Sequence, residues 1–284
     1  RYVGVKTEPS YPKPIGQDIV LVERIGTEEN SPQELIRLEG ATGNVKWRLT
    51  LDDRCAEPLE HGGRLYLSGS SGKLHIVNAE TGQQEGYVKF SQPLASPPAV
   101  NAEKGVLYVA GEHSSLYSIK LADNSCIGVY YSRHGRGAVA AAPAVVLDKV
   151  VVVENDGAQT CKLRALSING EGAIAKAIQE RRLDGRVVRA PLVNGRRLVV
   201  LTDRGQISVY DVSAGSEGEA LANLANRPAL GGSPFLRFAA LADHNIWYCE
   251  TSLSKFVVAP AGNRLTIQDL AEDYNRSQFV APLE

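Results

Sequence analysis

One sequence pattern recurs along the chain and constrains its fold more than any other feature. Each copy has an apolar run, a short turn rich in Gly, Ser or Asp, and an alternating run that ends in a turn of the A-x-T-G type. The copies occupy residues 19–43, 65–82, 107–124, 199–215 and 247–262. In the first copy a longer insertion, Thr27–Gln33, replaces the tight turn. A unit this small cannot bury both of its faces alone, so the copies must stack against one another.

A proline with small or apolar neighbours precedes each unit. These prolines stand 40 to 48 residues apart, at Pro14, Pro58, Pro98, Pro143, Pro191, Pro234 and Pro282. A period of about 45 residues with four short strands per unit is typical of a propeller blade.

We therefore predict one all-β domain over residues 1–284, a β-propeller of four-stranded antiparallel blades. Its six units are expected at approximately 14–57, 58–97, 98–142, 143–190, 191–233 and 234–281. Either six blades close the ring, or the chain is an excerpt of a seven- or eight-bladed ring.

Strand character differs between segments of the repeat. Val150–Val153 and Leu198–Leu201 are apolar throughout, which predicts inner strands that are buried on both faces. Leu74–Asn78 and Ile207–Asp211 alternate, which predicts outer strands with one wetter face. Ser213–Asn226 is the only helix-like window, and it could equally be a long loop.

Charge and hydropathy exclude two classes of function. The chain has 31 Lys and Arg against 32 Asp and Glu, a net charge of −1, which opposes nucleic-acid binding through bulk positive charge. No apolar run approaches the length of about 18 residues that a membrane-spanning helix needs. The chain contains no Met and begins at Arg1, so we expect an excerpt or a processed form and leave open a leader or anchor.

The sequence offers little catalytic or metal-binding chemistry. Its four cysteines (55, 126, 161 and 249) form no CxxC pair, and its five histidines are scattered. Asp52-Asp53 is the only adjacent pair of aspartates, and a lone pair is weak support for calcium. No GxSxG, Walker or GxGxxG motif occurs. We predict no catalytic residue and no metal site.

The best copies share a specific set of residues. One copy carries Pro58, Tyr66, Gly72 and Gly82, and another carries Pro98, Gly105, Tyr108 and Tyr117. This pattern resembles the repeat of the PQQ-type (quinoprotein-like, BamB-like) β-propeller family. One branch of that family holds quinone-dependent dehydrogenases, and the other holds binding propellers without a cofactor.

The function that the resemblance implies depends on which of these two branches the chain resembles. The chain lacks the adjacent cysteine pair of the alcohol dehydrogenases and is much shorter than those enzymes. We therefore expect a non-enzymatic binding or scaffold module with no cofactor, which belongs to a larger bacterial protein of the periplasm or cell envelope. A PQQ-dependent oxidoreductase with calcium, or a degenerate relative, is the alternative. A sensor domain attached to a kinase or another catalytic region is a third.

Arginines recur in the connectors between successive units. Seven of them are candidate ligand-binding residues: Arg54, Arg133, Arg136, Arg186, Arg189, Arg227 and Arg276. In a propeller these connectors line the mouth of the central channel on one face. Converging guanidinium groups bind carboxylates and phosphates in a forked geometry. The hypothesis is that a protein partner or another anionic ligand, such as an acidic peptide or a glycan, docks there. The open edges of terminal blades offer a second place for a partner strand.

Overall fold

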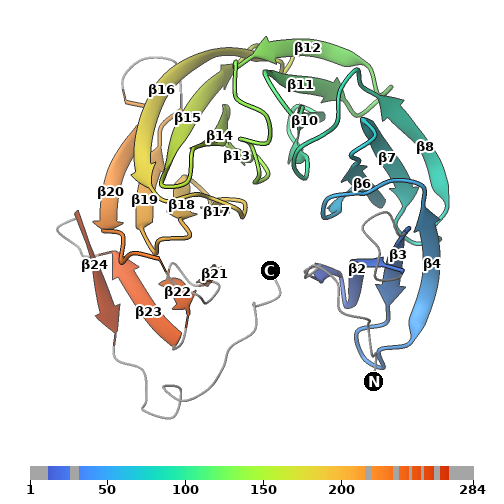
Figure 1. The fold of residues 1–284 in the computed structure, drawn as a ribbon, viewed down its shortest axis with the longest axis horizontal. Helices are drawn as coiled ribbons and strands as arrows, with labels where there is room; N and C mark the ends of the chain where they lie inside the picture. Colours follow the sequence, from blue (N-terminus) through green and yellow to red (C-terminus); the bar gives the residue numbers. More distant parts are fainter. Residues whose placement is uncertain are drawn as a thin grey trace.

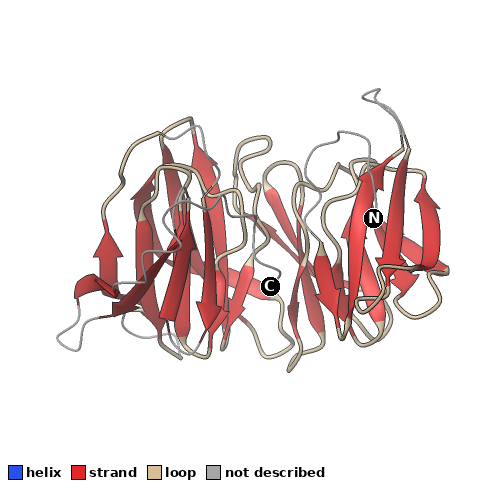
Figure 2. Ribbon diagram, turned by 90° about the horizontal axis from the view of Figure 1, so that it is seen from below, coloured by secondary structure: helices blue, strands red, loops and turns tan. Residues whose placement is uncertain are grey.

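The computed structural model describes residues 12–25, 32–214, 219–232, 237–242, 245–250, 253–258 and 263–268. Within these ranges every helix or strand is a β-strand, and the strands form six four-stranded antiparallel sheets. Figure 2 shows the strands running between two faces, with loops and turns at their ends. The prediction of an all-β propeller with six units is confirmed.

The first three sheets take up the N-terminal half of the chain. The first contains β1 (Lys13–Ile15), β2 (Asp18–Arg24), β3 (Gln33–Leu38) and β4 (Val45–Leu51). The second contains β5 (Leu59–His61), β6 (Arg64–Ser68), β7 (Lys73–Asn78) and β8 (Gln84–Lys89). The third contains β9 (Ala99–Asn101), β10 (Val106–Ala110), β11 (Ser115–Lys120) and β12 (Cys126–Tyr131).

The other three sheets follow in chain order. The fourth contains β13 (Ala144–Val146), β14 (Lys149–Asp156), β15 (Thr160–Ile168) and β16 (Ile174–Asp184). The fifth contains β17 (Leu192–Asn194), β18 (Arg197–Leu201), β19 (Ile207–Val212) and β20 (Leu221–Arg227). The sixth contains β21 (Phe238–Ala242), β22 (Asn245–Cys249), β23 (Leu253–Val258) and β24 (Asn263–Gln268).

The six sheets stand around a common axis in chain order (Figure 1). Within each sheet the spatial order of the strands equals their chain order, and the first, short strand lies nearest the axis. The innermost strands of the third to sixth sheets contact one another in sequence, β9 with β13, β13 with β17 and β17 with β21. The outer edges of the last two sheets are also joined, because β20 pairs in parallel with β24.

The recurring prolines mark the start of the innermost strands. Pro58, Pro98, Pro143 and Pro191 each stand directly before the first strand of a sheet, and Pro14 lies inside β1. Proline lacks an N–H and is tolerated at the first residue of a strand or on an edge strand. The innermost strand of a blade is such an edge. Pro234 and Pro282 lie outside the described residues.

Among the described residues the hydrophobic core forms five clusters, and each cluster lies between two consecutive sheets. Leu35 of the first sheet packs with Leu67 of the second, and Val153 of the fourth packs with Leu198 of the fifth. The second strands β14 and β18 are buried along Val150–Val153 and Leu198–Val200, as their apolar sequences predict. Each sheet therefore depends on its neighbours for burial of its apolar faces.

The predicted wetter face of β7 and β19 is wrong. Leu74–Val77 and Ile207–Tyr210 are buried throughout, because each third strand is covered by the neighbouring sheets on both faces. Their polar members are hydrogen-bonded inside: His75 contacts Asp53, and Ser208 donates to Asn226. Exposed alternation belongs instead to the outermost strands, including β4, β8 and β12.

The helix-like window Ser213–Asn226 contains a strand. β20 begins at Leu221 and pairs with β19, with a β-bulge at Val209/Tyr210. Leu221 and Ala225 are both buried but belong to different clusters, toward the fourth and the sixth sheet respectively. The bulge shifts the alternation and produces a four-residue spacing of buried positions that resembles helical periodicity.

Candidate functional site

The strand order brings all connectors between sheets to one face of the molecule. Each connector runs from the end of an outermost strand to the start of the next innermost strand. The turns between second and third strands lie at the same ends of the strands. We call this side the connector face. Its described connector residues are 52–58, 90–98, 132–143, 185–191, 228–232 and 237.

Polar side chains fix these connectors against the adjacent turns. The amide of Gln92 donates to the hydroxyl of Tyr117 at 2.9 Å and accepts from the backbone N–H of His113 at 3.0 Å. Asn155 bonds both the N–H and the carbonyl of Val187, at 2.8 and 3.0 Å. The connector face is thus a set of braced loops, a suitable support for a binding surface.

Three of the predicted arginines lie on two connectors of this face. Arg54 and Arg133 are exposed on the connectors after the first and third sheets. Arg136 is 78% exposed and forms an ion pair with Glu112, with 2.8 Å between Nε and Oε1. An exposed pair of this kind contributes little to stability. Arg276 lies outside the described residues.

The structure brings the other three predicted arginines near a fourth, Arg237. Two of these guanidinium groups stack on aromatic rings of the sixth sheet. Arg189 lies 4.4 Å from the ring centre of Phe238, and Arg227 lies 4.7 Å from that of Tyr248. Such stacking holds a cation in place while leaving its edge able to hydrogen-bond. We call Arg186, Arg189, Arg227 and Arg237 the arginine cluster.

Hydrogen bonds connect two members of the cluster, Arg186 and Arg237, through Asp203. The side chain of Asp203 accepts from the backbone N–H of Arg186 at 2.7 Å, and the carbonyl of Asp203 accepts from Arg237. Arg237 is 4% exposed at its side chain and pairs with Glu250 at 2.9 Å. Glu250 in turn accepts from the hydroxyl of Tyr248 at 2.9 Å.

The pKa of Tyr248 reflects the same neighbourhood. Burial raises the pKa of its hydroxyl, and the hydrogen bond to Glu250 raises it further, while the charges of Arg237 and Arg227 oppose the shift. Both guanidinium groups therefore act on one phenol.

Several nitrogens of the cluster lack an acceptor. Within the described part of the chain, no group accepts a hydrogen bond from Nε of Arg186, Nη1 of Arg227 or Nε of Arg237, although all three atoms are enclosed. Enclosed donors without partners cost free energy, so an added acceptor stabilises them. Carboxylates and phosphates are the acceptors whose geometry and charge suit guanidinium groups best.

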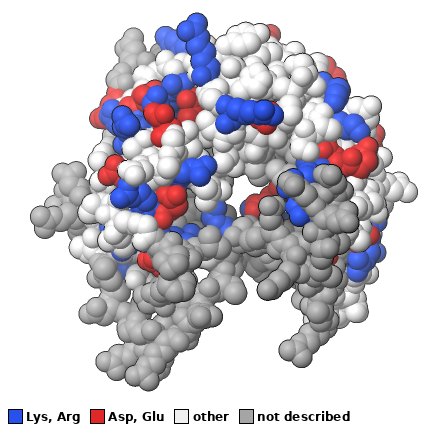
Figure 3. All heavy atoms as spheres, viewed as in Figure 1, with Lys and Arg blue, Asp and Glu red and all other residues white. Residues whose placement is uncertain are grey.

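In the view of Figure 3, the Lys and Arg side chains do not form one continuous patch. Lys and Arg lie beside Asp and Glu in several places, and the molecule is hollowed near its centre. Recognition by arginines then depends on local geometry at the cluster more than on a long-range field.

Arg237 was missed because it stands beyond Pro234, outside the connector windows that end at each proline. A usable signal was present: Arg237 directly precedes the innermost strand β21, much as Arg189 stands shortly before β17.

A second polar cluster joins the first two sheets. One ligand-type atom from each of Asp53, Cys55 and His75 lies within 4.8 Å of the others. Nε2 of His75 is 3.3 Å from Oδ2 of Asp53, and the two side chains are 0% and 2% exposed. Asp53 also accepts from Ser71, through its N–H at 2.9 Å and its hydroxyl at 2.5 Å.

The titration of this second cluster follows from its burial. Burial raises the pKa of the Cys55 thiol, and the charges of Asp53 and Asp52 raise it further. Burial also works to raise the pKa of Asp53, but the hydrogen bonds from Ser71 and others outweigh it, so that carboxyl is an acid stronger than usual. The spacing of these three residues in the sequence did not predict the cluster. The cluster forms because the connector after the first sheet runs past a strand of the second sheet.

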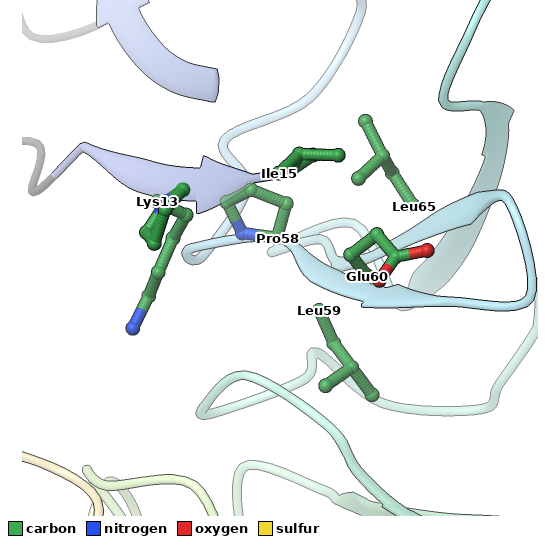
Figure 4. Close-up of a pocket in the computed structure, with 7 residues that line it drawn as sticks. Lys13, Ile15, Pro58, Leu59, Glu60 and Leu65 are labelled. Atoms are coloured by element: carbon green, nitrogen blue, oxygen red, sulfur yellow. The ribbon is translucent and has the colours of Figure 1, made fainter. Parts of the chain in front are cut away.

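A pocket of about 250 Å³ lies between the innermost strands of the first two sheets. Its walls are mixed in polarity, and Figure 4 shows the apolar residues Ile15, Pro58 and Leu65 among those that line it. Lys13 and Glu60 supply the charges at its border. Nothing in this lining suggests acid–base catalysis.

The fold defines the chain as a β-propeller protein, and a family model matches part of its sequence. Residues 8–123 match the family model described as outer membrane protein assembly factor BamB, which confirms the resemblance to PQQ-type repeats. No curated protein sequence matches the chain. The described residues contain no helix that could cross a membrane.

Solved structures confirm the fold across most of the chain. BamB from Moraxella catarrhalis is similar with a TM-score of 0.60 at 12% identity, over 91% of this chain and 71% of that one. A chain of the Mitotic Checkpoint Complex gives 0.66 at 14% identity, over 94% and 78%. The computationally designed Ika8 protein gives 0.68 at 11% identity, over 98% and 78%.

Proposed function

We propose that the chain is a non-enzymatic binding module that docks an acidic segment of a protein partner on its connector face, at the arginine cluster. The observation that carries the proposal is the set of enclosed guanidinium nitrogens without described acceptors on Arg186, Arg227 and Arg237. A carboxylate that bonds these nitrogens supplies an acceptor that the described residues do not provide.

The geometry favours a side chain or chain end with a carboxylate over a bulky ligand. The cluster lies among braced loops, and two of its cations, Arg189 and Arg227, are already oriented by aromatic rings of the sixth sheet. Oriented cations lose little conformational freedom on binding, so affinity is gained by preorganisation. The fold agrees with this role, because similar propellers include a member of a named multiprotein complex.

We further propose that the module acts in the cell envelope of a bacterium. The support is the match of residues 8–123 to a family of outer-membrane assembly factors.

The test is binding of a fluorescent ten-residue peptide rich in Glu, measured by anisotropy at low ionic strength. The double variant Arg186→Gln, Arg227→Gln removes two guanidinium groups, and we expect it to weaken binding about tenfold or more, since each charge-assisted hydrogen bond contributes about 1.5–3 kcal/mol. A control variant, Arg48→Gln with Arg196→Gln, removes the same charge from exposed ion pairs with Glu34 and Asp211.

Equal weakening in both double variants would show that only net charge matters and would contradict the proposal. A melting curve for each variant excludes unfolding as the cause. The double variant Arg186→Lys, Arg227→Lys keeps the charge and removes the forked donor geometry of the guanidinium groups. It should also bind the peptide more weakly than the wild type.

A further inference from the structure

We propose that Asp53, Cys55 and His75 form a binding site for a thiophilic divalent cation of the Zn²⁺ class. The site lies where the connector after the first sheet crosses the second sheet, apart from the arginine cluster. It is independent of the proposed partner binding.

The three side chains offer the ligand types that Zn²⁺ takes in proteins: a carboxylate oxygen, a thiolate sulfur and an imidazole nitrogen. Their ligand atoms already lie within 4.8 Å of one another. Bond lengths to Zn²⁺ of about 2.0–2.3 Å place the ligands of one ion somewhat closer together, so a small inward shift completes the set. Three protein ligands leave a fourth position for water.

The surroundings supply the supporting contacts that a metal site needs. The other ring nitrogen of His75, Nδ1, lies 3.3 Å from the side-chain amide of Gln84. With the amide oxygen of Gln84 turned toward it, Nδ1 carries the proton and Nε2 is free to bind the cation; amide orientation and tautomer adjust together. The hydroxyl of Ser70 donates to Oδ1 of Asp53 at 3.0 Å, which orients that carboxylate.

The backbone holds the ligands at fixed positions. Cys55 forms an isolated antiparallel bridge with Gly69 in the turn before β7, and its N–H donates to Gln33 at 2.7 Å. His75 lies inside β7, paired with Leu67 of β6. A cation held here would tie two chain segments together, the connector after the first sheet and β7 of the second, so binding should stabilise the fold.

The experiment uses the whole chain, stripped of metal with a chelator, and Co²⁺ as a spectroscopic probe followed by Zn²⁺. The expected result is one Co²⁺ per chain with a thiolate-to-cobalt charge-transfer band, displacement by Zn²⁺, and a rise in melting temperature with Zn²⁺. Cys55→Ser should abolish the band. Cys126→Ser is the matched control, because its thiol is exposed and far along the chain, and it should keep the band.

A positioning variant tests the site without removing a ligand. Gln84→Ala should weaken cation affinity about 10- to 100-fold while leaving the metal-free melting temperature close to that of the wild type. The proposal is overturned if no charge-transfer band forms, or if the band survives in Cys55→Ser. It is also overturned if Gln84→Ala binds as tightly as the wild type. A failure of peptide binding at the arginine cluster would have no effect on these results.

Discussion

At the scale of single residues, one buried arginine, Arg37, forms an ion pair within the first sheet and links that sheet to the second. Arg37 reaches from β3 to Asp18 of β2 at 2.6 Å and also donates to the carbonyl of Ala79 at 2.7 Å in the second sheet. Both side chains of the pair are nearly enclosed. Such a pair is costly to break because the remaining charge is left buried.

The titration of Asp18 gives a pH prediction. Its hydrogen bond with Lys46, and next its contacts with Arg37, hold the pKa of Asp18 below the usual value, against the effect of burial. A lowered folded-state pKa stabilises the protein above the unfolded pKa of about 4, and the contribution is lost as pH falls through the folded value. We expect Asp18→Asn to unfold at lower urea than the wild type at pH 7, with a difference that shrinks below about pH 4.

Urea unfolding across pH 3 to 7 measures this difference. Glu103→Gln, on an exposed turn, is the control for loss of one negative charge. A gap between Asp18→Asn and wild type that stays constant down to pH 3 would contradict the assigned role of the carboxylate.

The chemistry of single residues was the level that the sequence predicted least well. It predicted connector arginines as a group, and three of them meet at the cluster with Arg237, which it missed. It expected no metal site, because the histidines are scattered and no CxxC pair occurs; Cys55, on a connector, and His75, inside β7, stand 20 positions apart. Proximity of this kind depends on how a connector crosses its neighbouring blade, and no local pattern encodes that crossing.

At the scale of strands and turns, the A-x-T-G turn is explained by a close contact between sheets. Gly82 adopts φ +71°, and a Cβ at this position would lie 2.5 Å from the ring of Trp47 in the first sheet. The indole of Trp47 also donates to the carbonyl of Ala79 at 3.1 Å. The glycine of the repeat therefore serves both a left-handed turn and the packing of one blade on the next.

Gly82→Ala should reduce the free energy of unfolding by more than Gly105→Ala does. Gly105 has φ +62° and open space around it, so its substitution costs only the left-handed strain of about 1–2 kcal/mol. Overpacking against Trp47 should add about 1–3 kcal/mol at Gly82. Denaturant unfolding measures both, and a change in tryptophan fluorescence should accompany Gly82→Ala alone. Equal costs would contradict the packing role.

Strand identity was largely predictable, and strand exposure was not. Runs such as Val150–Val153 have both the composition and the burial of inner strands. Alternation in β7 and β19 suggested a wet face, but blades on both sides cover these third strands, so His75 and Ser208 are buried with partners. A bulge gave β20 a helix-like spacing. Periodicity reports on local geometry, and burial in a propeller is decided by the neighbouring blades.

At the scale of the whole molecule, the chain is a series of sheets joined by shared clusters. Five core clusters occupy the five boundaries between consecutive sheets, and connectors return to one face each time. This regularity follows from the period of the sequence, which made the architecture the most predictable level. It also places the connectors, and the arginine cluster with them, on the connector face.

The central claim is that this face binds an acidic segment of a partner, and photo-crosslinking tests it most directly. A Glu-rich peptide with a photoreactive group at one end is irradiated with the protein, and crosslinked residues are identified by mass spectrometry. The account predicts crosslinks within 185–191 and 228–232 and at Arg227 and Arg237, the positions that carry or flank the arginine cluster. Crosslinks concentrated on the outermost strands β4, β8 and β12, or spread evenly over the surface, would contradict it.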